Sequence, residues 1–294
     1  MAIPQTTMGR LNHHPVKLLI KTLAYRIGVR TLTESLFMAA GAALTALFVT
    51  HPAGIAILVI TGVVLVIFNL ATRVSVAFAI LIYNQIPAQR YPELKKCFEW
   101  AIRIGHYVAP MGFALYQTGS SGIVLHEAGH ALMASLVYQD PHIRMRVEPF
   151  VSGVTWYRAW PLTALGERLG YEWADACVSA AGSGVEMLAV VGLLAASYGT
   201  RESRPELSRY LFCTSVQIVI QVAQYALSAL WSHKPGHDFA ALALAGMHPA
   251  AAISLTLAVP IITRLGIGLY DYCEARPLVD FHIDTERVLT LREV

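Results

Sequence analysis

The chain has 294 residues, of which 55% are apolar and only 14% are charged, and its mean hydropathy is +0.52. A soluble domain carries about 25% charged residues, so this chain lacks the polar residues that would cover a water-exposed surface. Its formal net charge of +3 is too small to indicate nucleic-acid binding. Composition therefore predicts an integral, multi-pass membrane protein in contact with the lipid bilayer, built as an all-α bundle of membrane-spanning helices.

Residues 1–104 are predicted to form a basic N-terminal segment and accessory membrane helices. Lysine and arginine recur through residues 1–33, and this positive charge before the first span places the N-terminus on the cytoplasmic side. Two apolar stretches, 36–50 and 53–71, are separated by His51-Pro52. A proline at this point ends one helix and starts another, which predicts a helical hairpin or two tilted spans.

Residues 105–262 are predicted to form the core of the protein, which begins with a short apolar segment. Gly119-Ser120-Ser121-Gly122 follows it, and we expect these small residues to break the chain, with Ser120 or Ser121 capping a new helix. The new helix reads Ile-Val-Leu-His-Glu-Ala-Gly-His-Ala-Leu-Met over residues 123–133. Imidazoles and a carboxylate in such an apolar helix cost several kcal/mol, on the order of membrane-insertion penalties, unless they are paired or bind a metal.

His126 and His130 are four residues apart, so they share one face of a helix and can bind one cation together. Glu127 lies about 100° around the helix from His126, where it can reach a water on that cation without being a ligand. This is the His-Glu-x-x-His arrangement of zinc hydrolases, in which Zn²⁺ takes three protein ligands and keeps one position for water. The alternative is a hydrogen-bonded pair of core histidines with a structural carboxylate.

A β-hairpin is predicted at residues 144–157, directly after the histidine helix. Arginine alternates with apolar residues in its first half, β-branched and aromatic residues dominate its second half, and Pro149 and Gly153 lie between. This pattern indicates two short strands around a turn. Because the backbone of a hairpin is not satisfied within one segment, it requires protein or water around it at membrane depth.

The remaining core contains the candidates for a third zinc ligand, which are Asp238, His237 and Glu186. Asp238 and His237 lie in a break between apolar stretches, where a carboxylate can be presented at membrane depth without lipid contact. Glu186 lies within a regular predicted span, 174–198, and is alternatively a hydrogen-bond partner of a ligating histidine or a substrate contact. Residues 263–294 are polar enough to be a C-terminal tail.

The order of these motifs resembles the site-2 protease family of intramembrane zinc metalloproteases, over residues 122–240. Residues 126–130, His-Glu-Ala-Gly-His, look like the family's His-Glu-x-x-His, and residues 147–154, Val-Glu-Pro-Phe-Val-Ser-Gly-Val, look like its Pro-Phe-Gly-Gly-type hairpin. Residues 181–186 are similar to its Gly-Pro-x-x-Asn segment, with Glu186 at the asparagine position. Residues 234–239 lie where the family has a Leu-Asp-Gly motif that supplies an aspartate ligand, although Phe239 follows Asp238 in place of glycine.

The resemblance implies an intramembrane protease with His126, His130 and Asp238 as zinc ligands and Glu127 as the general base. Its substrate would be a membrane-spanning protein, bound where the hairpin pairs an edge with an unwound segment. Such contacts would come from the end of the hairpin turn and the second strand, namely Val151, Ser152, Gly153 and Val154. Two other functions fit the motifs: a membrane zinc hydrolase that acts on lipid amides or esters, and a non-catalytic protein that binds metal or protons.

Overall fold

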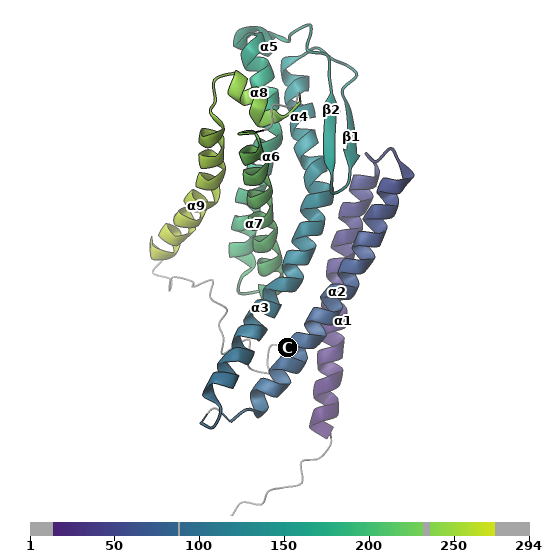
Figure 1. Ribbon diagram of the computed structural model, residues 1–294, viewed down its shortest axis with the longest axis vertical. Coiled ribbons are helices and arrows are strands. Elements are labelled where there is room, and N and C mark those ends of the chain that lie inside the picture. Colours follow the sequence, from purple (N-terminus) through teal and green to yellow (C-terminus); the bar gives the residue numbers. More distant parts are fainter. Residues whose placement is uncertain (1–13, 88, 232–235, 274–294) are drawn as a thin grey trace, which may run out of the picture.

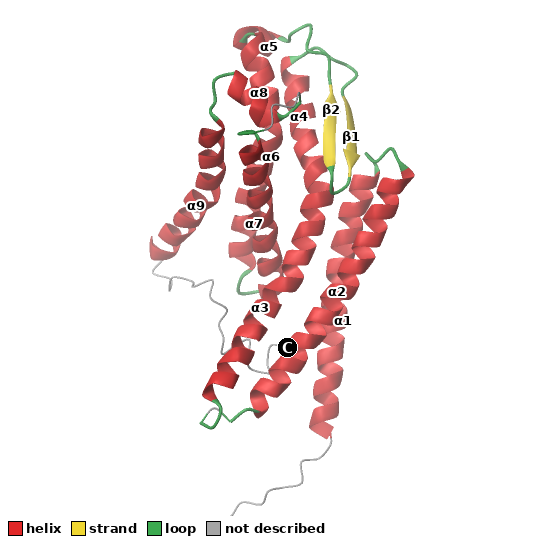
Figure 2. Ribbon diagram, in the orientation of Figure 1, coloured by secondary structure: helices red, strands yellow, loops and turns green. Residues whose placement is uncertain are grey.

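The computed structural model describes residues 14–87, 89–231 and 236–273. These residues form helices and one two-stranded antiparallel sheet, so the predicted all-α bundle with a short β-hairpin is confirmed (Figure 2). Among the described helices, four are long and apolar enough to cross a membrane, as expected for a membrane protein.

The helices and strands follow one another along the chain in this order: α1 (His14–Ala46), α2 (Pro52–Gln85), α3 (Pro92–Gln117), η1 (Thr118–Gly122), α4 (Ile123–Val137), β1 (Arg144–Glu148), β2 (Ser152–Trp156), α5 (Ala164–Leu169), α6 (Tyr171–Thr200), α7 (Pro205–Ser228), α8 (Asp238–Leu244) and α9 (Pro249–Cys273). The four helices that are both long and apolar enough to cross a membrane are α2, α6, α7 and α9.

Helices α1 and α2 form the predicted helical hairpin, which lies beside α3 (Figure 1). The turn between them is built by His51 and Pro52. The Nδ1 atom of His51 accepts a hydrogen bond from the backbone N–H of Ala53 at 3.2 Å, and Pro52 occupies the first turn, where its missing N–H has no cost. The break between the two accessory helices therefore falls where the apolar pattern is interrupted, although α1 begins earlier than the first apolar stretch, at His14, and α2 continues past the second, to Gln85.

Helices α3 and α4 are joined without a break, so the predicted interruption at residues 119–122 is wrong. The five residues of η1 form a π-helical turn that keeps the chain helical from Pro92 to Val137. The hydroxyls of Ser120 and Ser121 do not cap a helix. They donate to the carbonyls of Tyr116 at 2.6 Å and Gln117 at 3.1 Å, four residues back. This back-bonding satisfies the hydroxyls inside a helix and explains why small polar residues do not end it.

The predicted β-hairpin is confirmed, with Arg144 opposite Trp156 and Glu148 opposite Ser152. Its turn places Pro149 before Phe150, whose φ of 63° is rare for a residue other than glycine. The backbone N–H of Phe150 donates to the carbonyl of Gly119 at 2.6 Å, and a side chain at Gly119 would collide with the Phe150 ring. The π-helical turn thus anchors the hairpin tip and holds Phe150 in this conformation.

Helices α6, α7 and α9 form the second half of the bundle, and α4 packs against α6. Their shared core contains Val190 and Leu194 from α6, with Ile218 and Val222 from α7. Helix α9 continues to Cys273, beyond residue 262, the predicted boundary between the core and the tail. The buried Asp271 contacts Tyr198 of α6 and Arg201, the residue directly after α6, which explains how the polar end of α9 stays helical and packed. Residues 274–294 of the predicted tail lie outside the described chain.

Candidate metal centre

Three side chains converge between α4 and the start of α8. His126 and His130 project from one face of α4, and Asp238 is the first residue of α8. The Oδ2 atom of Asp238 lies 2.9 Å from Nε2 of His126 and 3.1 Å from Nε2 of His130, and the two Nε2 atoms are 3.1 Å apart. Two imidazole nitrogens and one carboxylate oxygen therefore form a group that could hold a metal ion.

Helix α6 leaves room for this group because it carries glycine at the point of contact. A Cβ atom at Gly182 would lie 2.6 Å from Nε2 of His130 and 2.7 Å from Nε2 of His126. A second glycine, Gly129 of α4, allows α4 and α6 to pack closely. A Cβ atom at Gly129 would lie 2.5 Å from the carbonyl oxygen of Ala181. The space beside the two nitrogens thus depends on a missing side chain, as a bound ion would require.

The second ring nitrogen of each histidine is held by a hydrogen-bond acceptor on α6. Nδ1 of His126 lies 2.9 Å from Oε2 of Glu186, and Nδ1 of His130 lies 2.7 Å from the Val178 carbonyl oxygen. Because a carbonyl only accepts, His130 carries a proton on Nδ1, and its neutral form therefore presents a lone pair on Nε2. The carboxylate of Glu186 favours the same tautomer at His126. Such partners orient metal ligands in many metal sites.

Glu186 and His237, the other two candidates for a third ligand, are not among the converging donor atoms. Glu186 is buried at 4% exposure and lies on the opposite side of the His126 ring from Asp238. His237 stacks on Tyr225 with ring centroids 4.3 Å apart, and its Nε2 lies 2.8 Å from the Ser228 hydroxyl. The geometry therefore assigns Glu186 to the support of His126 and leaves His237 outside the donor group.

Glu127 is buried beside the donor group, at 5% exposure, and faces the second strand of the hairpin. The Thr155 hydroxyl lies 2.7 Å from Oε2 of Glu127 and 3.1 Å from its backbone oxygen. A Cβ atom at Gly153 would lie 2.5 Å from Oε1 of the same carboxylate. One face of β2 therefore fixes the position of Glu127, with Thr155 as the hydrogen-bond donor and Gly153 providing space.

Two residues of the site, Thr155 and Tyr225, were not predicted from the sequence. Thr155 belongs to the predicted hairpin, but only the strand register places its side chain against Glu127. Tyr225 of α7 lies in an apolar helix without a motif. Its hydroxyl accepts a hydrogen bond from the backbone N–H of Asp238 at 3.2 Å, and its ring packs edge-on against His126 with centroids 5.9 Å apart. Alternation along β2 was the one available indication for Thr155, since it shares a face with Gly153.

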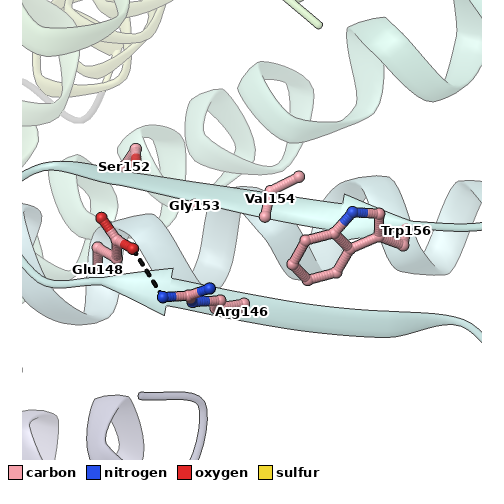
Figure 3. Close-up of a pocket in the computed structure, with 6 residues that line it drawn as sticks. All are labelled: Arg146, Glu148, Ser152, Gly153, Val154 and Trp156. Carbon is pink, nitrogen blue, oxygen red and sulfur yellow. Dashed lines mark hydrogen bonds and ion pairs between the residues drawn. The ribbon is translucent and has the colours of Figure 1, made fainter. Parts of the chain in front are cut away.

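The other face of the hairpin is open. Figure 3 shows a shallow pocket there, lined by residues of both strands, namely Arg146, Glu148, Ser152, Gly153, Val154 and Trp156. Two of these lining residues, Arg146 and Glu148 of β1, form an ion pair at 3.0 Å. Three of the residues predicted to bind substrate line this pocket, and the fourth, Val151, lies in the adjoining turn at 72% exposure.

The two edges of the sheet differ. The N–H of Val147 donates to the Phe48 carbonyl at 3.1 Å, so the outer edge of β1 is covered by the turn after α1. The backbone N–H and C=O groups of Val147 therefore point away from β2, and Val147 forms a non-hydrogen-bonded pair with Gly153. By alternation, the backbone groups of Gly153 and Thr155 point to the outer edge of β2. Within the described chain, no backbone group pairs with that edge.

Comparison of the chain with protein-family models, with curated proteins and with solved structures finds no match. Its function is therefore inferred from the chemistry and geometry of the site.

Proposed function

We propose that this chain is a membrane-embedded zinc metalloendopeptidase, as its resemblance to the site-2 proteases implies. The observation that carries the proposal is the convergence of Nε2 of His126, Nε2 of His130 and Oδ2 of Asp238, with Glu127 held beside them. In this proposal the protein crosses the bilayer several times with its N-terminus in the cytoplasm, and its partner is a membrane-spanning protein substrate.

Zinc suits the donor set. Imidazole nitrogen and carboxylate oxygen are common zinc ligands, and three protein ligands are typical of a catalytic site that keeps one position open. The acceptors on Nδ1 of both histidines support ligation through Nε2. A zinc ion bound here would supply a Lewis acid and make water reactive near neutral pH.

Glu127 is the proposed general base, because it lies next to the ligands in sequence but is not one of the converging donors. Its carboxylate would take a proton from the attacking water and deliver it to the leaving amine. Thr155 would keep one carboxylate oxygen oriented, since its hydroxyl lies 2.7 Å from Oε2. Both residues would therefore act on proton transfer, Glu127 directly and Thr155 by positioning it.

The open edge of β2 is the proposed binding surface for substrate. A membrane-spanning helix must unwind before its peptide bonds can be attacked, and its backbone groups then require partners that lipid does not provide. The outward-pointing backbone groups of Gly153 and Thr155 provide these partners, and the same two residues contact Glu127 through the face of the strand. A substrate strand paired here would lie next to the catalytic carboxylate.

This edge also favours a peptide over a lipid amide or ester as substrate. A strand edge recognises an extended backbone with regularly spaced N–H and C=O groups, whereas an acyl chain offers none. The zinc site alone would serve either reaction, so the hairpin is the feature that separates the two functions.

A cleavage assay tests the proposal. The zinc-loaded protein and its Glu127→Gln variant are reconstituted and incubated with single-span peptides and, separately, with lipid amides and esters. We expect the protein to cleave peptides, and Glu127→Gln to keep its zinc while cleaving about 10²–10⁴-fold more slowly. Hydrolysis of the lipids alone, or no hydrolysis by zinc-loaded protein, would contradict the proposal.

A further inference from the structure

The second half of α7 has two different faces. One face is apolar and is buried in the core that α7 shares with α6 and α9. The other face carries Gln217, Gln221 and Gln224, which are four and three residues apart and therefore lie along one line on the helix. Gln217 and Gln221 are half-buried, and Gln224 is exposed. A helix that is long and apolar enough to cross a membrane thus presents a row of amides.

The first half of the same face is closed by α3. Tyr210 lies two turns before Gln217, and its ring packs edge-on against the ring of Phe113 with centroids 6.4 Å apart. Thr214, which lies between them on α7, is buried, and its hydroxyl donates to the Tyr210 carbonyl at 2.9 Å. On the open part of the face, Ile220 is 41% exposed. The face is therefore covered as far as Thr214 and open from Gln217 onward.

The open part of this face leads to the metal centre. Tyr225 follows Gln221 by four residues, so it lies about one helical turn further along the same side of α7. Its ring packs edge-on against His126 with centroids 5.9 Å apart, and its hydroxyl accepts from the backbone N–H of Asp238 at 3.2 Å. A segment that lies against the glutamines would therefore continue directly to the donor atoms.

The two half-buried glutamines lie deep in α7. Gln217 is about 18 Å of helix from Pro205 and about 17 Å from Ser228, and Gln221 is about 10 Å from Ser228. A hydrocarbon core is about 30 Å thick, so both amides lie within it when α7 spans the membrane. Gln224 lies only about 6 Å from the end of α7, where water is within reach.

Neither Gln217 nor Gln221 has a hydrogen-bond partner among the residues that the structure describes. The hydroxyl of Ser228, in contrast, is satisfied within α7, since it donates to the Tyr225 carbonyl at 2.7 Å. A glutamine amide offers two N–H donors and a carbonyl acceptor, and lipid satisfies none of them. The open face therefore requires a partner that brings hydrogen-bonding groups into the membrane.

A substrate that unwinds inside the membrane is such a partner. An α-helix leaves four backbone N–H groups or four carbonyls unpaired at each end, and a helix that ends at membrane depth has no water to satisfy them. We propose that Gln217 and Gln221 bind the membrane-spanning substrate where its remaining helix ends and its extended segment begins. The extended segment pairs with the edge of β2, and the amides of α7 satisfy the newly exposed helix end. Because an amide both donates and accepts, the glutamines serve either end of a helix.

This inference deepens the proposed protease function and rests on it for the identity of the partner. The partner is a single membrane-spanning segment whose helix ends within the hydrocarbon, beside the metal centre. Continuity of the glutamine face with Tyr225, which contacts both His126 and Asp238, favours this occupant over a second copy of the chain. A second copy would cover the face without delivering a peptide bond to the site.

Peptide binding tests the proposal in the zinc-loaded full chain carrying Glu127→Gln, which slows cleavage. The Kd of a fluorescent single-span peptide is measured by anisotropy in nanodiscs. We expect Gln217→Met/Gln221→Met to raise this Kd by about fivefold to tenfold, because methionine keeps the length of the side chain but removes its hydrogen bonds. Leu188→Met of α6, a position 72% exposed, is the control and should bind normally. An unchanged Kd in the double variant would overturn the proposal.

Cross-linking tests the same contact with both glutamines in place, so it does not depend on the folding of the double variant. A benzophenone amino acid replaces Ile220 or, as the control, Leu188, and the protein is irradiated with the peptide. Position 220 should give at least about fivefold more peptide adduct than position 188. Adducts to a second copy of the chain in place of the peptide would overturn the proposal.

The two proposals fail in different ways. If the protein cleaves peptides but the glutamine substitutions leave the peptide Kd unchanged, the protease function stands and the glutamine contact is wrong. A lower kcat with an unchanged Kd would assign the glutamines to the supply of water and would also overturn the contact. If the peptide binds through the glutamines but is not cleaved by the zinc-loaded protein, the protease function alone is wrong.

Discussion

Oε2 of Glu186 lies 2.9 Å from Nδ1 of His126, on the side of the imidazole ring opposite to Asp238. His126 is thereby held between two carboxylates, one at each ring nitrogen. The carboxylate on Nδ1 fixes the tautomer and the direction of the ring, and it makes Nε2 a more basic ligand. In the proposed zinc site, Glu186 is therefore the residue that orients His126 for metal binding.

Removing this carboxylate should weaken metal binding. We expect Glu186→Ala to raise the zinc Kd by about 10–100-fold, the range observed for partners of ligating histidines. Glu186→Gln should have a smaller effect, because its amide oxygen can still accept from Nδ1. Competition titrations with a chromophoric chelator measure both constants. An unchanged Kd in Glu186→Ala would show that His126 does not need this partner.

Gly182 offers a test of the space around the ligands. A methyl group there would lie 2.6–2.7 Å from both ligating nitrogens, so Gly182→Ala must displace the histidines or the helix, and zinc affinity should fall by at least about tenfold. Gly184→Ala is the matched control, since no atom lies within 4 Å of a Cβ there. The control should bind zinc normally and be more stable by up to about 1 kcal/mol, because alanine favours a helix. Equal zinc affinities in the two variants would refute this description of α6.

Thr155 should affect turnover without affecting the metal. Thr155→Val removes the hydroxyl that lies 2.7 Å from Glu127 but retains the shape of the side chain, so we expect kcat to fall while the zinc Kd stays the same. Thr155→Ser restores the hydroxyl and should recover most of the activity. The result that would count against a positioning role is equal kcat loss in the valine and serine variants, since only packing would then explain it.

Asp140 links the end of α4 to the chain that leaves β2. The backbone N–H groups of His142 and Arg158 donate to its carboxylate at 2.8 and 2.6 Å and hold the pKa of Asp140 below its usual range. The pKa of Asp140 is lower in the folded protein than in the unfolded chain, where it is about 3.9. The two hydrogen bonds therefore stabilise the folded protein fully above about pH 3.9, and this stabilisation is lost as the pH falls through the folded-state pKa. Asp140→Asn should therefore lower the melting temperature at pH 7, with a difference that narrows below about pH 4. Glu202→Gln, an exposed carboxylate at the other end of the bundle, serves as the control. This linkage would be excluded if Asp140→Asn lowered the melting temperature by the same amount at pH 7 and below about pH 4.

The parts of the site that could be predicted from sequence are those with local patterns. The spacing of His126 and His130 on a helix and the alternation of the hairpin are visible within a few residues. Asp238 contacts His126 from 112 positions further along the chain, so no local pattern indicates the contact. Asp238 is predicted as a ligand from its position in the order of motifs that resembles the site-2 proteases. No local pattern indicates the contacts of Gly182 and Tyr225, because these depend on how α6 and α7 pack against α4. The π-helical turn was missed for a related reason, since small polar residues are equally compatible with a break and with back-bonding to the preceding turn.

Metal content tests the central claim most directly. Zinc per chain is measured in the purified protein, in His126→Ala/His130→Ala and in Asp238→Ala, with His237→Ala as the neighbouring control, after circular dichroism has shown that each variant keeps its helices. About one zinc per chain is expected in the protein and in His237→Ala, none in the double variant and a sharply weakened affinity in Asp238→Ala. Undiminished zinc in the double variant would contradict the account, because no other group of three metal ligands was found in the described chain.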